Sequence, residues 1–140
     1  MIASLRGVLR ATSSEGVVID VGGVGFRVQI PESLRQQLPR IGQTVELHTH
    51  MAVRQNDITL YGFGTAEELE LFRVLLGVSG IGPRTALATL SAFSPEALRS
   101  IIASGDAEAL ARTPGIGRKT AQRLLLDLRD RLGGYEAMAT

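Results

Sequence analysis

The sequence predicts an α+β protein in which a small antiparallel β-barrel is followed by an all-α domain. From residue 1 to about residue 63, apolar residues alternate with polar ones, which is the period of half-buried strands. From residue 64 to residue 134, apolar residues recur at helical spacing, and a glycine-isoleucine-glycine phrase occurs twice. We therefore expect a barrel domain at 1–63, a helical domain at 64–134 and the start of a flexible linker at 135–140.

The strands of the barrel are predicted by short runs separated by turn residues. Residues 26–30 and 45–51 alternate between apolar and polar side chains, and 17–21 and 58–60 add two β-branched runs. Glycine, serine, proline, asparagine and aspartate fall between these runs, where turns are needed. Several such strands within about 60 residues favour an OB-type barrel.

The barrel carries few residues that would bind a ligand. OB barrels hold single strands on aromatic platforms, yet this half has only Phe26, Tyr61 and Phe63, and the chain has no tryptophan. We therefore interpret the barrel as a scaffold or assembly domain. His48 and His50 share one face of a strand and could hold a metal, but no third ligand is recognisable, so we expect a solvated strand face and no metal.

Helix-capping residues divide the second half into helices. Thr65 with Glu68 forms a capping box, Ser94 precedes a proline, and Asp106 caps a further short helix. We expect Gly133 and Gly134 to end the last helix. The side chains expected to point inward are Leu69, Phe72, Leu75, Leu76, Leu98, Ile101, Ile102, Ala121, Leu124, Leu125, Leu128 and Leu132.

The repeated phrase lies at residues 79–86 and 114–121. Gly80-Ile81-Gly82 and Gly115-Ile116-Gly117 lie 35 residues apart, and each is followed by basic residues and an apolar helical run. Glycines allow a sharp turn between two helices, and the isoleucine can fill the gap between them. The free N–H groups at the start of the second helix form an anion site that the helix dipole strengthens.

Basic residues at these helix starts support the anion site. Arg84, Arg118 and Lys119 lie in a first helical turn, where the dipole opposes a cation unless an anion is bound there. Arg123, one turn after Lys119, is well placed to add a contact to the nucleic acid. Arg129 could add one too, but it fits a solvated helix face with mixed charge equally well. A single copy could merely connect two helices, but two copies with basic residues indicate tandem helix-hairpin-helix motifs. Such a domain grips the nucleic-acid backbone by shape.

The composition excludes several classes of protein. A net charge of +1 means that DNA contact must come from the local placement of basic residues. The chain has no cysteine, so disulfides and thiolate metal sites are excluded. No signal-like N-terminus and no run of roughly 18 uncharged apolar residues occurs, so we expect a cytoplasmic protein without membrane contact. No P-loop is present, so we expect no cofactor and no ATPase activity in this chain.

The order of barrel and tandem hairpins resembles the RuvA family of Holliday-junction-binding subunits over the whole chain. The glycine-rich and tyrosine-containing stretches of the barrel are the selective part, since hairpin phrases also occur in glycosylases, ligases and nuclease subunits. The resemblance rests on Leu5-Arg6-Gly7, Val21-Gly22-Gly23-Val24-Gly25-Phe26, Leu60-Tyr61-Gly62-Phe63, Ser79-Gly80-Ile81-Gly82-Pro83 and Pro114-Gly115-Ile116-Gly117.

This resemblance implies a homotetramer that holds an open four-way junction, with one or two tetramers per junction. It implies a role in recombination, repair and the SOS response, with the RuvB ATPase driving branch migration and the RuvC resolvase as a further partner. Each subunit would hold one arm of duplex DNA. The implied DNA-binding residues are Gly80, Ile81, Gly82, Arg84, Gly115, Ile116, Gly117, Arg118, Lys119 and Arg123.

Two departures from the family pattern stand out. The family carries adjacent acidic residues in the turn after Val53, which form a pin at the junction centre. Here the turn reads Arg54-Gln55-Asn56-Asp57, so we expect the pin to repel phosphates less. The family also has a third domain after the linker that contacts RuvB, and this chain ends where that linker begins, so we expect the contact to be absent from it.

Two other functions compete with junction binding. A generic duplex-binding accessory module would use the same hairpin residues and differ only in assembly and substrate shape. A helix-hairpin-helix DNA glycosylase would need an acid in a base-flipping pocket. Asp127 is the candidate acid, but it lies on a leucine-lined helix that packing occupies, so we favour the non-enzymatic interpretation.

Overall fold

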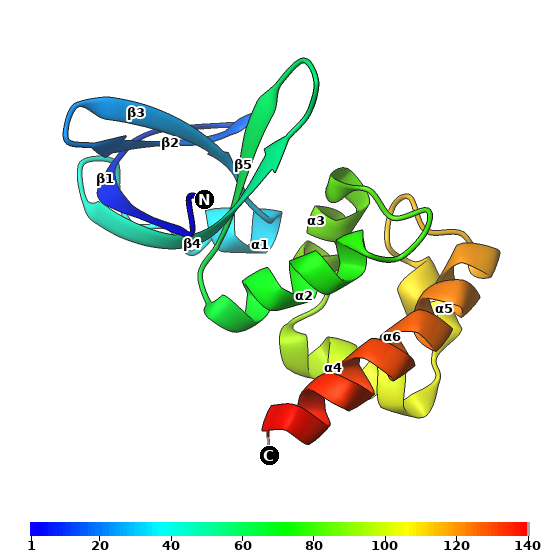
Figure 1. The fold of residues 1–140 in the computed structure, drawn as a ribbon. Coiled ribbons are helices and arrows are strands. Elements are labelled where there is room, and N and C mark those ends of the chain that lie inside the picture. The colour runs from blue at the N-terminus through cyan, green and yellow to red at the C-terminus, as the bar shows by residue number, and fades with distance from the viewer. Residues whose placement is uncertain (140) are drawn as a thin grey trace. The chain divides into compact units, whose positions relative to one another are not determined.

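Five strands close into a barrel in the first part of the chain (Figure 1). In the computed structural model, which describes the backbone of residues 1–139 and the side chains of residues 1–131, the strands follow the order β1-β2-β3-β5-β4. This confirms the predicted OB-like barrel and the α+β class. The strands are β1 (Ser4–Ser13), β2 (Gly16–Val21), β3 (Val24–Gln29), β4 (Thr44–Val53) and β5 (Ile58–Phe63).

One strand pair differs from the antiparallel barrel that the sequence predicts. β3 and β5 pair in parallel, with Val28 opposite Leu60, whereas the other neighbours pair antiparallel. A parallel pair needs a long connection between its strands. Here the connection includes the short helix α1 (Glu32–Arg35), which sequence reasoning missed, and all of β4.

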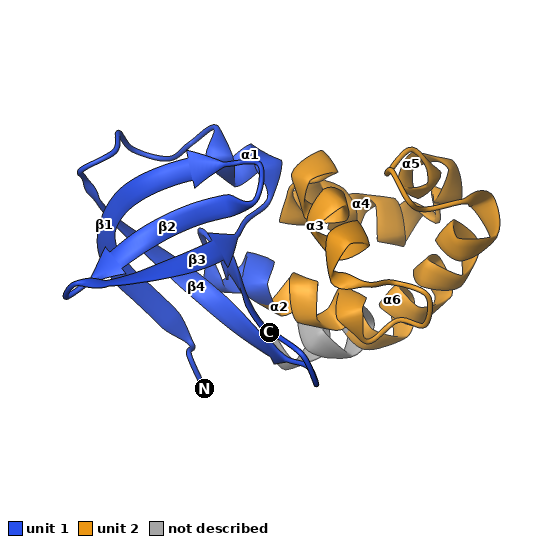
Figure 2. Cartoon of the chain, turned by 90° about the horizontal axis from the view of Figure 1, so that it is seen from above, with its two compact units in different colours: residues 1–69 blue, residues 70–140 orange. Residues whose placement is uncertain are grey.

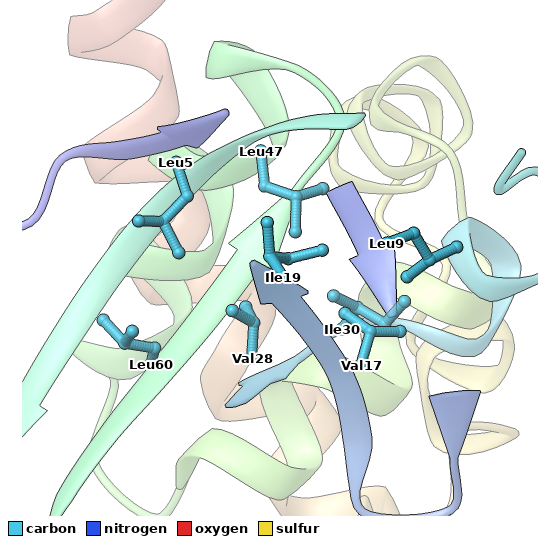
Figure 3. Close-up of a cluster of buried hydrophobic side chains, with 8 residues drawn as sticks. All are labelled: Leu5, Leu9, Val17, Ile19, Val28, Ile30, Leu47 and Leu60. Atoms are coloured by element: carbon cyan, nitrogen blue, oxygen red, sulfur yellow. The ribbon is translucent and has the colours of Figure 1, made fainter. Parts of the chain in front are cut away.

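The barrel interior is filled by aliphatic side chains from all five strands and the residue after β3 (Figure 3). These side chains point toward one another, as alternation along each strand requires. Phe26 is partly buried and packs against this cluster, as expected for a core residue. The cluster consists of Leu5, Leu9, Val17, Ile19, Val28, Ile30, Leu47 and Leu60.

In residues 1–139, whose backbone the structure describes, five helices follow the barrel. The chain divides into two compact units, residues 1–69 and 70–140, and the division falls within the first of these helices (Figure 2). The helices are α2 (Ala66–Leu76), α3 (Pro83–Ala92), α4 (Pro95–Ser104), α5 (Ala107–Ala111) and α6 (Arg118–Ala139).

The predicted caps are present at three helix starts. The Glu68 N–H donates to Thr65 Oγ1 at 3.2 Å, the Ala97 N–H to Ser94 Oγ at 3.1 Å, and the Ala109 N–H to Asp106 Oδ1 at 3.1 Å. The predicted end of the last helix is wrong, because α6 continues through Gly133 and Gly134 to Ala139. Glycine costs about 1 kcal/mol in a helix interior but can adopt helical dihedral angles, so two glycines weaken a helix without ending it.

The helical unit buries most of the predicted inward-facing side chains. Leu69, Leu76 and Ile101 are only partly buried, and the side chain of Leu132 lies outside the described residues. The helical stripe on each element therefore largely sets the core. In α2, Leu71 is buried although it is not among the predicted positions, while Leu69 and Leu76 are only partly buried. The confirmed buried positions are Phe72, Leu75, Leu98, Ile102, Ala121, Leu124, Leu125 and Leu128.

Candidate nucleic-acid interface

The two hairpin loops share one backbone hydrogen-bond pattern with an offset of 35 residues. In the first, the Ile81 N–H donates to the Val78 carbonyl at 3.1 Å; in the second, the Ile116 N–H donates to the Thr113 carbonyl at 3.1 Å. Further equivalent pairs are Val78 to Leu75 with Thr113 to Leu110, and Ala86 to Gly82 with Ala121 to Gly117. The sequence repeat is therefore also a structural repeat, formed by α2 with α3 and by α5 with α6.

Glycine and isoleucine have the local roles that the phrase predicts. Gly80 and Gly115 have φ values of 89° and 91°, a conformation that side-chain-bearing residues rarely adopt. Ile81 and Ile116 are buried, with exposed fractions of 6% and 5%. Each loop therefore turns at its first glycine and anchors its isoleucine in the core.

The second glycine of each loop leaves the following helix start open. Gly82 is the N-cap residue of α3 and provides no side-chain cap, in contrast to Ser94 of α4 and Asp106 of α5. A Cβ at Gly82 or Gly117 would meet no atom within 4 Å. The first-turn N–H groups of these two helices are thus approachable, and a helix start with free N–H groups attracts anions.

The charges around these helix starts complement an anion. α3 and α6 have no acidic residue in the first turn, whereas α2, α4 and α5 each have at least one. Arg84, Arg118, Lys119 and Arg123 are all exposed. Without an anion, the N-terminal dipole disfavours the cations in the first turn, so the arrangement is suited to holding a phosphate.

The two hairpins also meet each other. A Cβ at Gly115 would lie 3.0 Å from Oγ1 of Thr85, so the second loop lies against the first turn of α3. This contact brings the repeated phrases side by side within the helical unit, as a tandem motif requires.

Arg129 belongs to the packing of the helical unit. Its Nε donates to the carbonyl of Ile102 at 3.2 Å, and its guanidinium lies against Gly105. Arg129 thus holds a backbone carbonyl, a contact that neither the DNA-binding nor the solvated-face interpretation of the sequence included.

Comparison with known proteins agrees with both halves of the fold. Residues 1–62 match the family model described as the RuvA N terminal domain, and residues 72–130 match the SAM-like helix-hairpin-helix tandem. The chain is 51% identical over 137 residues to the Holliday junction branch migration complex subunit RuvA of Symbiobacterium thermophilum, covering 98% of this chain and 67% of that protein. The chain belongs to the RuvA family.

Other RuvA relatives show similar coverage. The subunits from Desulforamulus reducens and Pseudomonas syringae are 48% and 44% identical over 138 residues, which is 99% of this chain and 68% of each relative. The chain thus spans about two thirds of the length of the RuvA proteins it matches.

The turn in which the sequence analysis expects a pin is the tip of the β4–β5 hairpin. The Arg54 N–H donates to the carbonyl of Asp57 at 2.8 Å, and all four residues 54–57 are exposed. Val53 and Ile58, which face each other where the strands end, are 64% and 67% exposed. The hairpin therefore ends in a polar tip above an exposed apolar pair. Sequence reasoning did not identify this pair, because strand alternation places Val53 on the face of Leu47 and Ile58 on the face of Leu60, which are both buried.

The paired histidines of β4 lie on a partly buried strand face. His48 and His50 are both half-buried rather than solvated, and the His50 ring lies 6.5 Å from that of Tyr61 on β5. Among the residues whose side chains are described, no three histidine, cysteine or acidic residues gather in a way that could hold a metal ion. Within the same part of the chain, no helix has the length and apolar character that crossing a membrane requires.

Proposed function

We propose that this chain binds four-way junction DNA as a subunit of a branch migration complex, with no enzymatic activity of its own. Its RuvA relatives are named as subunits of a Holliday junction branch migration complex. The observation that carries the proposal is the pair of equivalent hairpins. In each, a glycine with open space where a side chain would stand leaves the start of the following helix open, and exposed cations lie beside it.

In this proposal each hairpin grips one stretch of phosphate backbone. The first-turn N–H groups beyond Gly82 and Gly117 donate to phosphate oxygens, while Gly80 and Gly115 shape the loops that Ile81 and Ile116 anchor. Arg84, Arg118, Lys119 and Arg123 add charge-assisted contacts. Phosphate contacts carry no sequence information, so the domain recognises the shape of the duplex.

We further propose a division of labour along the chain. Residues 64–134 form the DNA-binding domain, and residues 1–63 form the domain for assembly and the junction centre. The linker expected at 135–140 is wrong for 135–139, because these residues continue α6. In the barrel domain, Arg54, Gln55, Asn56 and Asp57 form a weakened pin, because only one of the four is acidic.

Four-fold assembly would give the junction preference. One subunit with a few phosphate contacts binds weakly and loses affinity as salt rises. In a homotetramer, the second and later arms bind at a high effective concentration, and only a four-armed substrate engages all subunits. The ATP-driven step would belong to a RuvB partner, and one or two tetramers would hold each junction in the cytoplasm.

The deciding experiment is a gel-shift titration of a four-way junction against a linear duplex of equal length at moderate salt. We expect the junction to bind at least about tenfold more tightly, which corresponds to about 1.4 kcal/mol. Equal affinity for both substrates would instead indicate a generic duplex-binding module.

A further inference from the structure

α6 carries a second arginine that binds a backbone carbonyl at the end of another helix. Nη2 of Arg131 donates to the carbonyl oxygen of Gly77 at 3.2 Å. Gly77 follows the last turn of α2, and its own N–H donates to the carbonyls of Arg73 and Val74. The carbonyls at the end of a helix lack partners within the helix and lie at the negative end of its dipole, so a guanidinium is favoured there.

Gly77 leaves the space that this guanidinium occupies. A Cβ at residue 77 would lie 2.5 Å from Nη1 and 3.2 Å from Cζ of Arg131. Gly77 is not among the glycines with positive φ, so its backbone does not require glycine. The absence of a side chain at residue 77 therefore serves the contact with Arg131 rather than the turn.

This contact joins the two hairpins through one rigid element. α6 begins with Arg118 and Lys119, the cations of the second hairpin, and Arg131 lies about 20 Å farther along the same helix at 1.5 Å per residue. Gly77 begins the loop of the first hairpin, three residues before Gly80. α6, which carries the proposed phosphate site of the second hairpin, thus also binds Gly77 at the start of the first hairpin loop.

We propose that Arg131 is a positioning residue that fixes the first hairpin loop relative to the second. The inference rests on the proposed function, because it assigns Arg131 an effect on DNA affinity without a contact to DNA. A duplex fixes the spacing between its phosphates, so two sites held at the matching spacing bind more tightly than two sites that must be ordered on binding.

The test compares Arg131→Gln with Gly77→Ala in titrations of linear duplex at several salt concentrations. Arg131→Gln removes the guanidinium, whereas Gly77→Ala keeps its charge but forces it away from its position, because a Cβ at residue 77 would lie 2.5 Å from Nη1. The displaced atoms are the flexible end of a side chain, so we expect the fold to persist. We expect both to lower the affinity by a similar factor, about threefold to tenfold, and to leave the salt slope unchanged, because that slope counts phosphate contacts.

Lys119→Gln is the matched control for a direct phosphate contact. It should lower the affinity and also reduce the salt slope by about 1. If Arg131→Gln reduces the slope in the same way while Gly77→Ala binds normally, Arg131 contacts phosphate and the positioning role is wrong. In the double variant, the two losses should not add, because both remove one contact; additive losses also contradict the proposal.

The same titrations separate the two proposals. If the natural chain binds neither junction nor duplex, the proposed function fails and the positioning role fails with it. If the natural chain binds and Gly77→Ala binds equally well, only the positioning role fails.

Discussion

Gly82 combines an ordinary backbone conformation with open space where a side chain would stand. Its φ and ψ are −95° and 178°, which any residue can adopt, and a Cβ would meet no atom within 4 Å. Packing and backbone geometry therefore do not require glycine here. In the proposed function, the missing side chain lets a phosphate approach the N–H groups of α3.

We accordingly expect Gly82→Ala to lower junction affinity about tenfold with little effect on folding. Alanine is a poorer N-cap than glycine but reduces the entropy of the unfolded chain, so the free energy of unfolding should change by less than about 1 kcal/mol. Gel shifts and urea unfolding measure the two effects. Gly64→Ala is the control, since Gly64 is an exposed glycine of the barrel unit whose nearest neighbour would be Leu34 Cδ1 at 3.4 Å; equal losses from both variants would count against the phosphate site.

Thr113 is a buried residue whose side-chain hydroxyl has no hydrogen-bond partner in the described part of the chain. It is 2% exposed, and its Oγ1 accepts and donates no hydrogen bond there. The equivalent residue of the first hairpin is Val78, which is also 2% exposed. A buried hydroxyl without a partner costs about 1–3 kcal/mol.

Replacing this hydroxyl by a methyl group should stabilise the protein. We expect Thr113→Val to raise the free energy of unfolding by about 1 kcal/mol, measured by urea denaturation. Val78→Thr, the reverse change in the first hairpin, should lower it. A destabilised Thr113→Val variant would mean that Oγ1 has a partner such as a bound water.

At the scale of an element, Asp20 holds the turn between β2 and β3. Its Oδ1 accepts from the Gly23 N–H at 2.8 Å, and its Oδ2 accepts from Arg10 Nε at 3.2 Å. The hydrogen bond from Gly23, and then that from Arg10, lower the pKa of Asp20. A lowered pKa in the folded state stabilises the protein above the unfolded pKa, and this stabilisation disappears as the pH falls through the folded pKa.

Asp20→Asn should therefore change the pH dependence of stability in one direction. We expect the variant to be less stable than the natural chain at about pH 7, and the difference to shrink as the pH falls below the ordinary aspartate pKa of about 3.9. Urea unfolding at a series of pH values measures this. A difference that persists unchanged at the acid end would assign the loss to turn geometry rather than to the charge.

The β4–β5 hairpin tip, residues 54–57, carries a single acidic residue, Asp57, at the proposed pin. We expect the double variant Gln55→Glu with Asn56→Asp to change the rate of branch migration of a bound junction more than it changes the affinity for the junction. The added carboxylates would repel phosphates at the centre while the hairpins keep their contacts. The control, Gln36→Glu with Gln37→Glu, adds the same charge at exposed positions after α1. Unchanged branch migration in the tip variant would contradict the pin.

At the scale of the whole molecule, a four-fold assembly should change how binding depends on salt. More subunits bring more phosphate contacts, so the logarithm of the affinity should fall more steeply with the logarithm of salt for a four-way junction than for a linear duplex. Mass measurement should give multiples of four subunits, alone and in the complex. A monomer with equal slopes on both substrates would contradict the tetramer.

Much of the candidate site could be predicted because its signals are local. Gly80 and Gly115 specify a turn that few other residues allow, and Thr65, Ser94 and Asp106 cap helices three residues ahead of themselves. The 35-residue offset of the sequence repeat also holds in the structure, since the backbone hydrogen bonds of the two loops match residue by residue. Local dihedral preferences and capping chemistry act within one turn of chain, so the sequence displays them directly.

The sequence by itself determined the α+β order of the chain, the strand period, the helix starts and the duplicated loops. Only the tertiary structure decided the parallel pairing of β3 with β5 and the contacts of Arg129 and Arg131 with the ends of α4 and α2. Arg131 and Gly77 lie 54 residues apart. Such contacts depend on how whole elements pack, which the pattern of a single segment does not contain.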